Sequence, residues 1–149
     1  MTHVARDPGF EARVRASFAA QAAMRTIGAE IEHVAAGEVD VRLPFRDDLT
    51  QQHGFVHAGM IGAIADSAAG YAAYTLMPAD AAVLSVEYKL NLMAPAAGEA
   101  FVARGRVKKS GRTLTICTAD VFALRDGEER LIATMLATMM TVMDRGLSG

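Results

Sequence analysis

Apolar and polar residues recur along the chain with two different periods. Near the start, Phe10, Val14 and Phe18 are spaced so that they share one face of a helix, with charged residues on the other faces. Asp7-Pro8 offers an N-cap followed by proline at the first helical position. This pattern predicts a short amphipathic helix over about residues 8–25.

Most of the remaining chain alternates with the period of a β-strand. The predicted strands are Ile31–Val34, Val39–Leu43, Leu84–Leu92, Phe101–Lys108, Thr113–Leu124 and Leu131–Met143. Ser110-Gly111 and Asp126-Gly127 stand where tight hairpin turns belong, which indicates an antiparallel sheet. The last strand is apolar on both faces, so we expect it to be central and covered from both sides.

One long segment between the second and third strands is almost entirely small or apolar. Its extent, His57 to Met77, is close to the ~20 residues that span a bilayer. Asp66 lies at its centre, however, and a charge there costs about 2.5–3.5 kcal/mol on membrane insertion. We therefore expect a buried helix from Ala58 to about Leu76 that covers one face of the sheet. The predicted fold class is α+β, in a single domain over 1–149.

The helical neighbours of Asp66 are all glycine or alanine. They lie three, four and seven residues away on either side: Gly59, Gly62, Ala63, Ala69, Gly70 and Ala73. A glycine inside a helix costs roughly 1 kcal/mol relative to alanine, so a close approach must offset the cost. Two interpretations are open: tight packing of a helix or strand, or a thin ligand channel with a carboxylate in its wall.

The start of the same helix is a second candidate for chemistry. N–H groups in the first turn have no helical acceptor, and one that follows His57 could polarise a carbonyl group. Asp66 lies roughly 12 Å further along the helix axis. That separation is too long for both groups to act on one carbonyl within a single subunit, whereas two subunits could bring them together.

Composition restricts the class of protein. The chain has 149 residues, a net charge of −2 and one cysteine, which argues against electrostatic binding of nucleic acid, an internal disulfide framework and a multi-cysteine zinc site. The four histidines form no metal-ligand pattern. Hydrophobic residues reach 52% with only 6% aromatic, a surplus that indicates an oligomer interface or an apolar ligand site. The first residues lack the apolar core of a secretion signal, so we expect a cytoplasmic protein.

Two further groups have a structural and a functional interpretation. Cys117 lies in a predicted strand without a paired histidine, which favours a buried, unreactive thiol. A basic cluster surrounds the Ser110-Gly111 hairpin: Arg104, Arg106, Lys108, Lys109 and Arg112. Such charges usually form a solvated sheet face, but they also suit the phosphates of a nucleotide-like ligand.

Two motifs resemble a known family. The segment Gln51–Ala68, with His57-Ala58-Gly59 and Asp66, resembles the signature of hotdog-fold acyl-CoA thioesterases, in the PaaI-type branch of the 4-hydroxybenzoyl-CoA thioesterase superfamily. The strand Ser85–Pro95 is similar to that family's second motif. The resemblance covers about residues 28–142, and it implies a curved antiparallel sheet wrapped around one central helix.

The resemblance implies roles for particular residues. Asp66 would be the general base or nucleophile in hydrolysis of an acyl-CoA thioester, Ser85 would help to hold the water, and the Ala58 N–H would polarise the carbonyl. The first position after His57 is usually glycine and the Gln51 position is usually asparagine, so this chain departs from the pattern twice. Further expected site residues are His57, chiefly as a structural anchor, Gly59, and the acyl-CoA contacts Gly62, Ala63, Lys108, Lys109 and Arg112.

In the family, the site forms between two subunits, so the resemblance implies a homodimer or homotetramer, with no cofactor, metal, nucleic acid or membrane partner. Two other functions fit the same residues. One is a non-catalytic acyl-CoA sensor or scaffold, which the altered Gln51 and Ala58 positions would allow. The other is a hotdog enoyl-CoA hydratase or dehydratase that uses His57 and Asp66.

Overall fold

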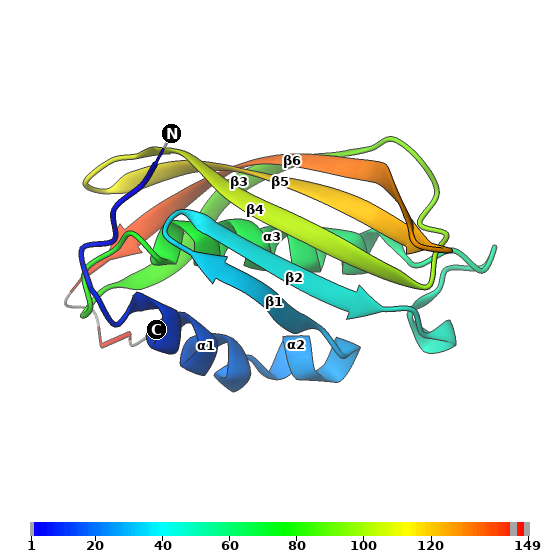
Figure 1. Cartoon of the computed structure of the whole chain (residues 1–149), viewed down its shortest axis with the longest axis horizontal. Helices are drawn as coiled ribbons and strands as arrows, with labels where there is room; N and C mark the ends of the chain where they lie inside the picture. Colours follow the sequence, from blue (N-terminus) through cyan, green and yellow to red (C-terminus); the bar gives the residue numbers. More distant parts are fainter. Residues whose placement is uncertain (1, 144–145, 148–149) are drawn as a thin grey trace.

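A six-stranded antiparallel sheet curls around one long helix in the computed structural model of the chain (Figure 1), which describes residues 2–143, 146 and 147. The strand order is β1-β2-β4-β5-β6-β3, and neighbours pair in antiparallel register. The strands are β1 (Glu30–Ala35), β2 (Glu38–Pro44), β3 (Ala82–Leu92), β4 (Ala100–Ser110), β5 (Leu114–Arg125) and β6 (Glu128–Val142). The predicted fold class and the six strands are confirmed.

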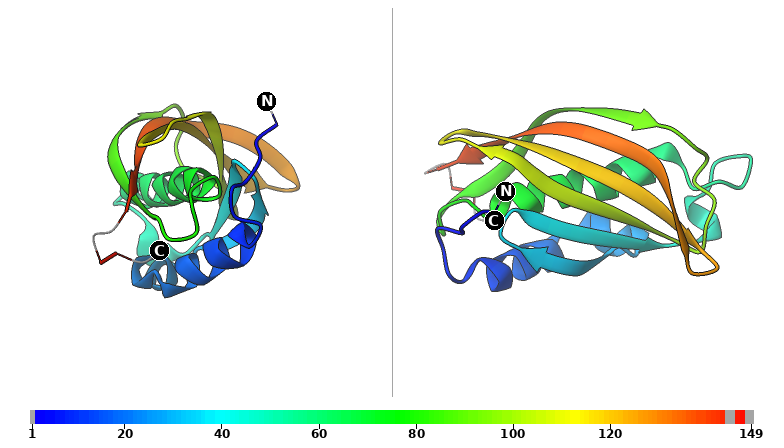
Figure 2. Two further views of the ribbon diagram at one scale, coloured as in Figure 1. Left: turned by 90° about the vertical axis from the view of Figure 1, so that its left-hand side faces the viewer. Right: turned by 45° about the horizontal axis from the view of Figure 1, so that its top comes forward.

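The central helix α3 (Ala58–Tyr74) lies in the concave side of the sheet, as the end-on view in Figure 2 shows. It ends two residues before the predicted Leu76. It comes very close to β4, where a Cβ atom added to Gly105 would lie 2.2 Å from the carbonyl oxygen of Ala68. Small residues on both elements therefore let the helix backbone touch the strand backbone. A short 3₁₀ turn, η1 (Asp47–Leu49), precedes the helix.

The N-terminal segment forms two helices where we expected one. α1 (Phe10–Ala20) and α2 (Ala22–Ile27) are separated by Gln21, whose backbone is extended at ψ 99°. The N-cap of α1 is Gly9, and the expected N-cap Asp7 instead accepts hydrogen bonds from the Gly9 N–H and the Arg13 side chain. Figures 1 and 2 show the two helices lying across the open side of the curled sheet, next to β1 and α3.

Arg13 ties α1 to the end of α3. Its guanidinium donates to the carbonyl oxygens of Tyr74, at 3.3 Å, and Met77, at 3.0 Å, and it pairs with Asp7 at 3.0 Å. Both carbonyls lie at the C-terminal end of α3, where a helix carries partial negative charge. The first helix is thus held against α3 by polar contacts as well as by its buried face, Val14 and Phe18.

The two predicted tight turns occur in the structure. Asp126 and Gly127 have φ angles of 51° and 77°, as a two-residue β-hairpin between β5 and β6 requires. The β4–β5 hairpin closes with a hydrogen bond from the Gly111 N–H to the Leu114 carbonyl oxygen at 2.8 Å.

The prediction for the last strand is only half right. β6 lies inside the sheet, between β5 and β3, and its inward residues Met135 and Met139 are fully buried. Its outward residue Leu136, however, is 53% exposed, so the part of the chain that the structure describes leaves this side chain uncovered. Strand β6 is therefore central within the sheet, as predicted, but its outward face is not covered at Leu136 by the described residues.

None of the helices in the described part of the chain is long and apolar enough to cross a membrane.

Candidate active site

Asp66 forms a hydrogen-bonded pair with a residue of the edge strand. The Ser85 hydroxyl donates to Asp66 Oδ1 over 2.7 Å, and the Asp66 side chain is half-buried on α3. Because an ionised carboxylate has several acceptor positions, one bond to Ser85 leaves others free for a water molecule. The structure therefore brings together the two residues that the family resemblance expects to act on the water molecule.

A β-bulge in β3 aims Ser85 at the helix. Ser85 pairs with Met139 and Glu87 pairs with Thr138, so Val86 is the extra residue of the bulge. Beyond it, Leu90 pairs with the buried Met135 and thus lies on the same side of the sheet as Ser85. Strict alternation would have placed Ser85 and Leu90 on opposite faces; the bulge reverses the parity and re-aims one side chain.

A hollow of about 430 Å³ opens beside this pair. Four parts of the chain line it: Ser17, Ala20 and Gln21 at the N-terminal helices, Asp66, Ser67, Gly70 and Tyr71 on α3, Ala82 to Ser85 on β3, and Leu147. We call it the Asp66 hollow. Its wall combines polar groups, which are hydroxyls, an amide and the Asp66 carboxylate, with short aliphatic side chains.

The start of α3 carries the second predicted feature. His57 is the N-cap, and its Nδ1 accepts the Gly59 N–H at 2.8 Å. The N–H groups of Met60 and Ile61 donate to the His57 carbonyl oxygen. Among residues 2–143, 146 and 147, the Ala58 N–H has no acceptor. His57 thus acts as a structural cap, and the donor left free in the first turn is the one proposed from the sequence.

Ala58 opens into a different hollow from Asp66. This second hollow, the Ala58 hollow, has a volume of about 500 Å³. Its lining residues are Gln51, Phe55, Val56, Ala58, Ile61, Leu92, Met93, Ala94, Pro95, Ala96 and Ile132, none of which lines the Asp66 hollow. Gln51 Oε1 accepts the backbone N–H of His53, which ties the Gln51 side chain to its own loop. A single chain therefore holds the two halves of the expected site apart.

The glycine and alanine neighbours of Asp66 divide between the two interpretations, tight packing and a ligand channel. Ala69 and Ala73 are fully buried, and a Cβ on Gly62 would touch Leu90 at 3.4 Å, so this part packs against the sheet. Gly70 lines the Asp66 hollow, and a Cβ there would come no closer than 3.9 Å to any atom outside the helix. The expected contacts Gly62 and Ala63 do not line that hollow.

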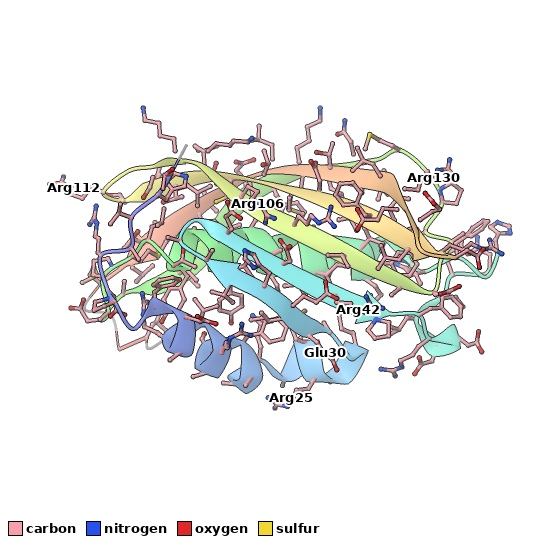
Figure 3. The ribbon with its side chains drawn as sticks, in the orientation of Figure 1. Arg25, Glu30, Arg42, Arg106, Arg112 and Arg130 are labelled. Carbon is pink, nitrogen blue, oxygen red and sulfur yellow. The ribbon has the colours of Figure 1, made fainter. Side chains whose placement is uncertain are left out.

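The basic cluster divides into two groups. Arg104 forms a two-pronged pair with Glu129, at 3.0 and 2.6 Å, and Arg106 pairs with Asp40; both lie on the outer face of the sheet (Figure 3 labels Arg106). The Glu129 pair raises the pKa of Arg104. These two arginines are the solvated, paired sheet face that the sequence allowed as one interpretation.

The other group, Lys108, Lys109 and Arg112, is exposed around the β4–β5 hairpin, and Figure 3 shows Arg112 at one extremity of the molecule. Val107 donates to the Gly37 carbonyl, and Gly37 in turn donates to the Thr75 side chain just after α3. The hairpin therefore lies beyond the C-terminal end of α3, away from Ala58 at its start. The structure does not bring these three residues to either hollow, apart from Arg112 in a neighbouring surface depression with Leu84.

Cys117 is buried, and burial raises the pKa of its thiol to about 12, as expected of an unreactive side chain. Among the described residues there is no group of three or more histidine, cysteine, aspartate or glutamate side chains placed to hold a metal ion.

Several residues of the two hollows were not predicted from the sequence. Ser17, Gln21 and Tyr71 come together in the wall of the Asp66 hollow, and Phe55 and Leu92 line the Ala58 hollow. The only available signal was the i, i+4 spacing of Ser17 with Gln21 and of Ser67 with Tyr71, which places each pair on one helix face. Which helix faces meet is a tertiary property that spacing does not contain.

Comparison with known proteins agrees with this architecture. A thioesterase family protein from Silicibacter pomeroyi has a solved structure that superposes with a TM-score of 0.90 at 52% identity, covering 91% of this chain and 100% of that one. The Escherichia coli PaaI protein of the phenylacetic acid degradation operon shares the fold, with a TM-score of 0.80 at 16% identity over 89% of this chain and 93% of that one. A proposed esterase from Halobacterium salinarum is 27% identical over 105 residues, 67% of this chain and 69% of that protein.

The family assignment is consistent with the site as well as with the fold. The model of the thioesterase superfamily matches residues 53–129, more than half of the chain, and this span includes both Ala58 and the Asp66–Ser85 pair. The family and the relatives together support hydrolysis of a thioester bond. The chain thus belongs to the thioesterase superfamily, and its sheet curled around α3 is a hotdog fold.

Proposed function

We propose that this protein hydrolyses acyl-CoA thioesters to a free acid and coenzyme A, with Asp66 as the general base. The observation that carries the proposal is the Asp66–Ser85 pair at 2.7 Å in the wall of an open hollow. A carboxylate held by a hydroxyl and reachable from solvent is able to bind a water molecule and accept its proton.

Asp66 and the Ala58 N–H supply the proton transfer and the charge stabilisation that hydrolysis of a thioester needs. Asp66 accepts a proton from water as the water oxygen attacks the thioester carbonyl carbon. Negative charge develops on the carbonyl oxygen, where the free Ala58 N–H and the positive end of α3 stabilise it. The carbon–sulfur bond then breaks, and the proton held by Asp66 passes to the departing thiolate, which leaves as free thiol.

The complete site is proposed to form between two copies of the chain. Ala58 and Asp66 are roughly 12 Å apart along α3 and open into separate hollows. Strand β3 is an edge of the sheet with one side unpaired, and it and its neighbours expose Leu84, Val86, Tyr88, Leu92 and Leu136 at 47–53%. An apolar edge of this kind is unusual on a monomer, and a second copy would cover it and place its own Ala58 near Asp66.

Lys109 and Arg112, with Lys108, are proposed to hold the phosphates of coenzyme A. The three side chains are exposed at one hairpin, and the described residues give none of them an ion-pair partner. Arg112→Ala should raise KM for an acyl-CoA several-fold and leave KM for the matching acyl-pantetheine, which lacks the nucleotide phosphates, unchanged. An equal rise for both substrates would remove the hairpin from the site.

The catalytic assignment is tested with Asp66→Asn and an acyl-CoA panel, with free thiol detected by a thiol reagent. We expect kcat to fall by about 10²- to 10⁴-fold. Asp120→Asn is the matched control, because Asp120 bonds Thr134 on the sheet, away from both hollows. Near-normal hydrolysis by Asp66→Asn would refute the assignment, and binding of acyl-CoA without any thiol release by the wild type would favour a sensor instead.

The shared site is tested with Ala58→Pro. Proline has no N–H and is well tolerated at the first helical position, so the variant removes the proposed donor while α3 keeps its start. Loss of one such donor costs roughly 10²- to 10³-fold in kcat. When Ala58→Pro and Asp66→Asn chains are unfolded together and refolded, mixed dimers regain one intact site, and about a quarter of wild-type activity should return. No recovery would show that both groups act within one chain.

The PaaI-type branch and a cytoplasmic location stay predictions from the sequence.

A further inference from the structure

A cluster of uncharged polar side chains in the Asp66 hollow has no part in the proposed hydrolysis. Ser17 and Gln21 from the N-terminal helices meet Ser67 and Tyr71 of α3 there. The Tyr71 hydroxyl lies 3.1 Å from Ser17 Oγ and accepts from Gln21 Nε2 at 3.4 Å, while Ser67 Oγ donates to Gln21 Oε1 at 3.4 Å. We call these four residues the polar wall.

The polar wall is built to stay in one arrangement. Tyr71 is 5% and Ser67 is 8% exposed, and the Tyr71 ring packs edge-on against both Phe18 and Tyr74. Burial also raises the pKa of Tyr71, so its hydroxyl remains a neutral donor and acceptor. Gln21 occupies the break between α1 and α2, which is the local departure from helix that lets its amide reach both Tyr71 and Ser67.

The hydrogen bonds within the polar wall leave capacity for a ligand. Two of the three are 3.4 Å long, beyond the usual range for a strong bond. A glutamine amide has two N–H groups and two oxygen lone pairs, and the contacts above use one of each. A polar atom brought into the hollow would therefore find a donor and an acceptor in fixed positions.

The polar wall begins at Ser67, directly after Asp66 in the sequence, and its far end on α3 is Tyr71. Tyr71 follows Asp66 by five residues, about 7.5 Å along the helix axis. The hollow that holds both residues is also lined by the short side chains of Ala82 and Val83 and by Gly70. An acyl chain whose carbonyl carbon is attacked at Asp66 would thus run along the hollow and reach the Tyr71 hydroxyl several carbons later.

We propose that the Asp66 hollow selects acyl groups carrying a hydroxyl or carbonyl group several carbons from the thioester, with Gln21 and Tyr71 as the specificity-determining residues. This inference rests on the proposed function. A saturated chain in the hollow would strip water from the polar wall and return no hydrogen bond, whereas a substituted chain replaces that water. Sites with fixed hydrogen-bonding groups reject ligands that lack the matching group.

The test compares hexanoyl-CoA with 6-hydroxyhexanoyl-CoA, which differ by one terminal hydroxyl. The wild type should favour the hydroxylated substrate by about 5- to 10-fold in kcat/KM, the size of one or two net hydrogen bonds. Tyr71→Phe and Gln21→Leu should each bring this ratio close to one, by slowing the hydroxylated substrate and by relieving the desolvation cost for hexanoyl-CoA. Tyr74→Phe is the matched control, because Tyr74 is buried on the same helix but does not line the hollow.

A binding measurement separates this inference from the proposed function. Titration of both acyl-CoAs into Asp66→Asn by calorimetry reports the preference without turnover, and the hydroxylated ligand should have the lower Kd by a similar factor. Equal Kd values, or a preference that Tyr71→Phe and Gln21→Leu both leave intact, would overturn the selection by the polar wall. Absence of hydrolysis in the wild type with the Kd preference retained would instead contradict only the thioesterase assignment.

Discussion

The contact between α3 and β4 makes Gly105→Ala a severe test of how this fold is packed. An added Cβ would lie 2.2 Å from the Ala68 carbonyl oxygen, 2.3 Å from its carbonyl carbon and 2.8 Å from the Ala69 nitrogen. Non-bonded carbons prefer separations of about 3.5–4.0 Å, so α3 would have to move roughly 1 Å away from β4 at this contact.

The cost should fall at the upper end of the usual range. Overpacking a core typically costs about 1–3 kcal/mol, and here neither side is a flexible side chain, because backbone faces backbone. For a chain of this length, about 3 kcal/mol corresponds to a Tm lower by roughly 6–12 °C. Thermal unfolding followed by circular dichroism, at one fixed protomer concentration, measures it.

Gly70→Ala is the matched control on the facing helix. Its Cβ would meet only Met139 Sδ, at 3.9 Å, so the substitution adds no clash. Alanine is favoured over glycine by about 1 kcal/mol in a helix interior, and Tm should therefore rise by roughly 2–4 °C. A Gly105→Ala protein within 2 °C of the wild type, or a Gly70→Ala protein that loses stability as much as Gly105→Ala, would refute this account of the small residues.

Three further predictions concern single side chains. His57→Asn keeps a capping acceptor and should retain both Tm and most activity, whereas His57→Ala should lose about 1 kcal/mol of stability; an inactive but stable His57→Asn protein would assign catalysis to the ring. Burial raises the pKa of the Cys117 thiol from 9.0 to about 12. The free energy of unfolding should therefore fall as pH rises between those values, because the thiol of the unfolded chain ionises first. The thiol should react with a thiol reagent at pH 8 only after denaturation, and rapid reaction of the native protein would contradict this. Arg13→Met breaks the Asp7 pair and two carbonyl contacts at the end of α3 and should cost about 1–3 kcal/mol by urea unfolding, while Arg15→Met, at an exposed pair, should change little.

The proposed site could be predicted only in part from the sequence. Asp66 is identifiable from the sequence because it is the single carboxylate in a helix of small and apolar residues. The free N–H at Ala58 follows from helix geometry, since N–H groups of the first turn have no helical acceptor. Ser85 was reached only through the family resemblance. Its partnership with Asp66 depends on a bulge at Val86, which no periodicity signals.

The polar wall was beyond prediction from the sequence. The sequence pattern predicts Gln21 inside one continuous helix. In the structure its backbone is extended, and its side-chain amide donates a hydrogen bond to the Tyr71 hydroxyl, 50 residues away. That contact exists because α1 and α2 lie across the open side of the curled sheet, beside α3. Helix spacing states which side chains share a face but not which face meets which.

The sequence by itself determined the elements of this protein: the central helix, the strands and their hairpins, and the one charge that the helix carries. Local rules suffice for these because periodicity, turn residues and helix ends act over a few neighbouring positions. Only the tertiary structure decided which partners those elements meet. Gly105 allows β4 to touch α3, the bulge turns Ser85 toward Asp66, and Leu136 stays exposed because none of the described elements packs over it.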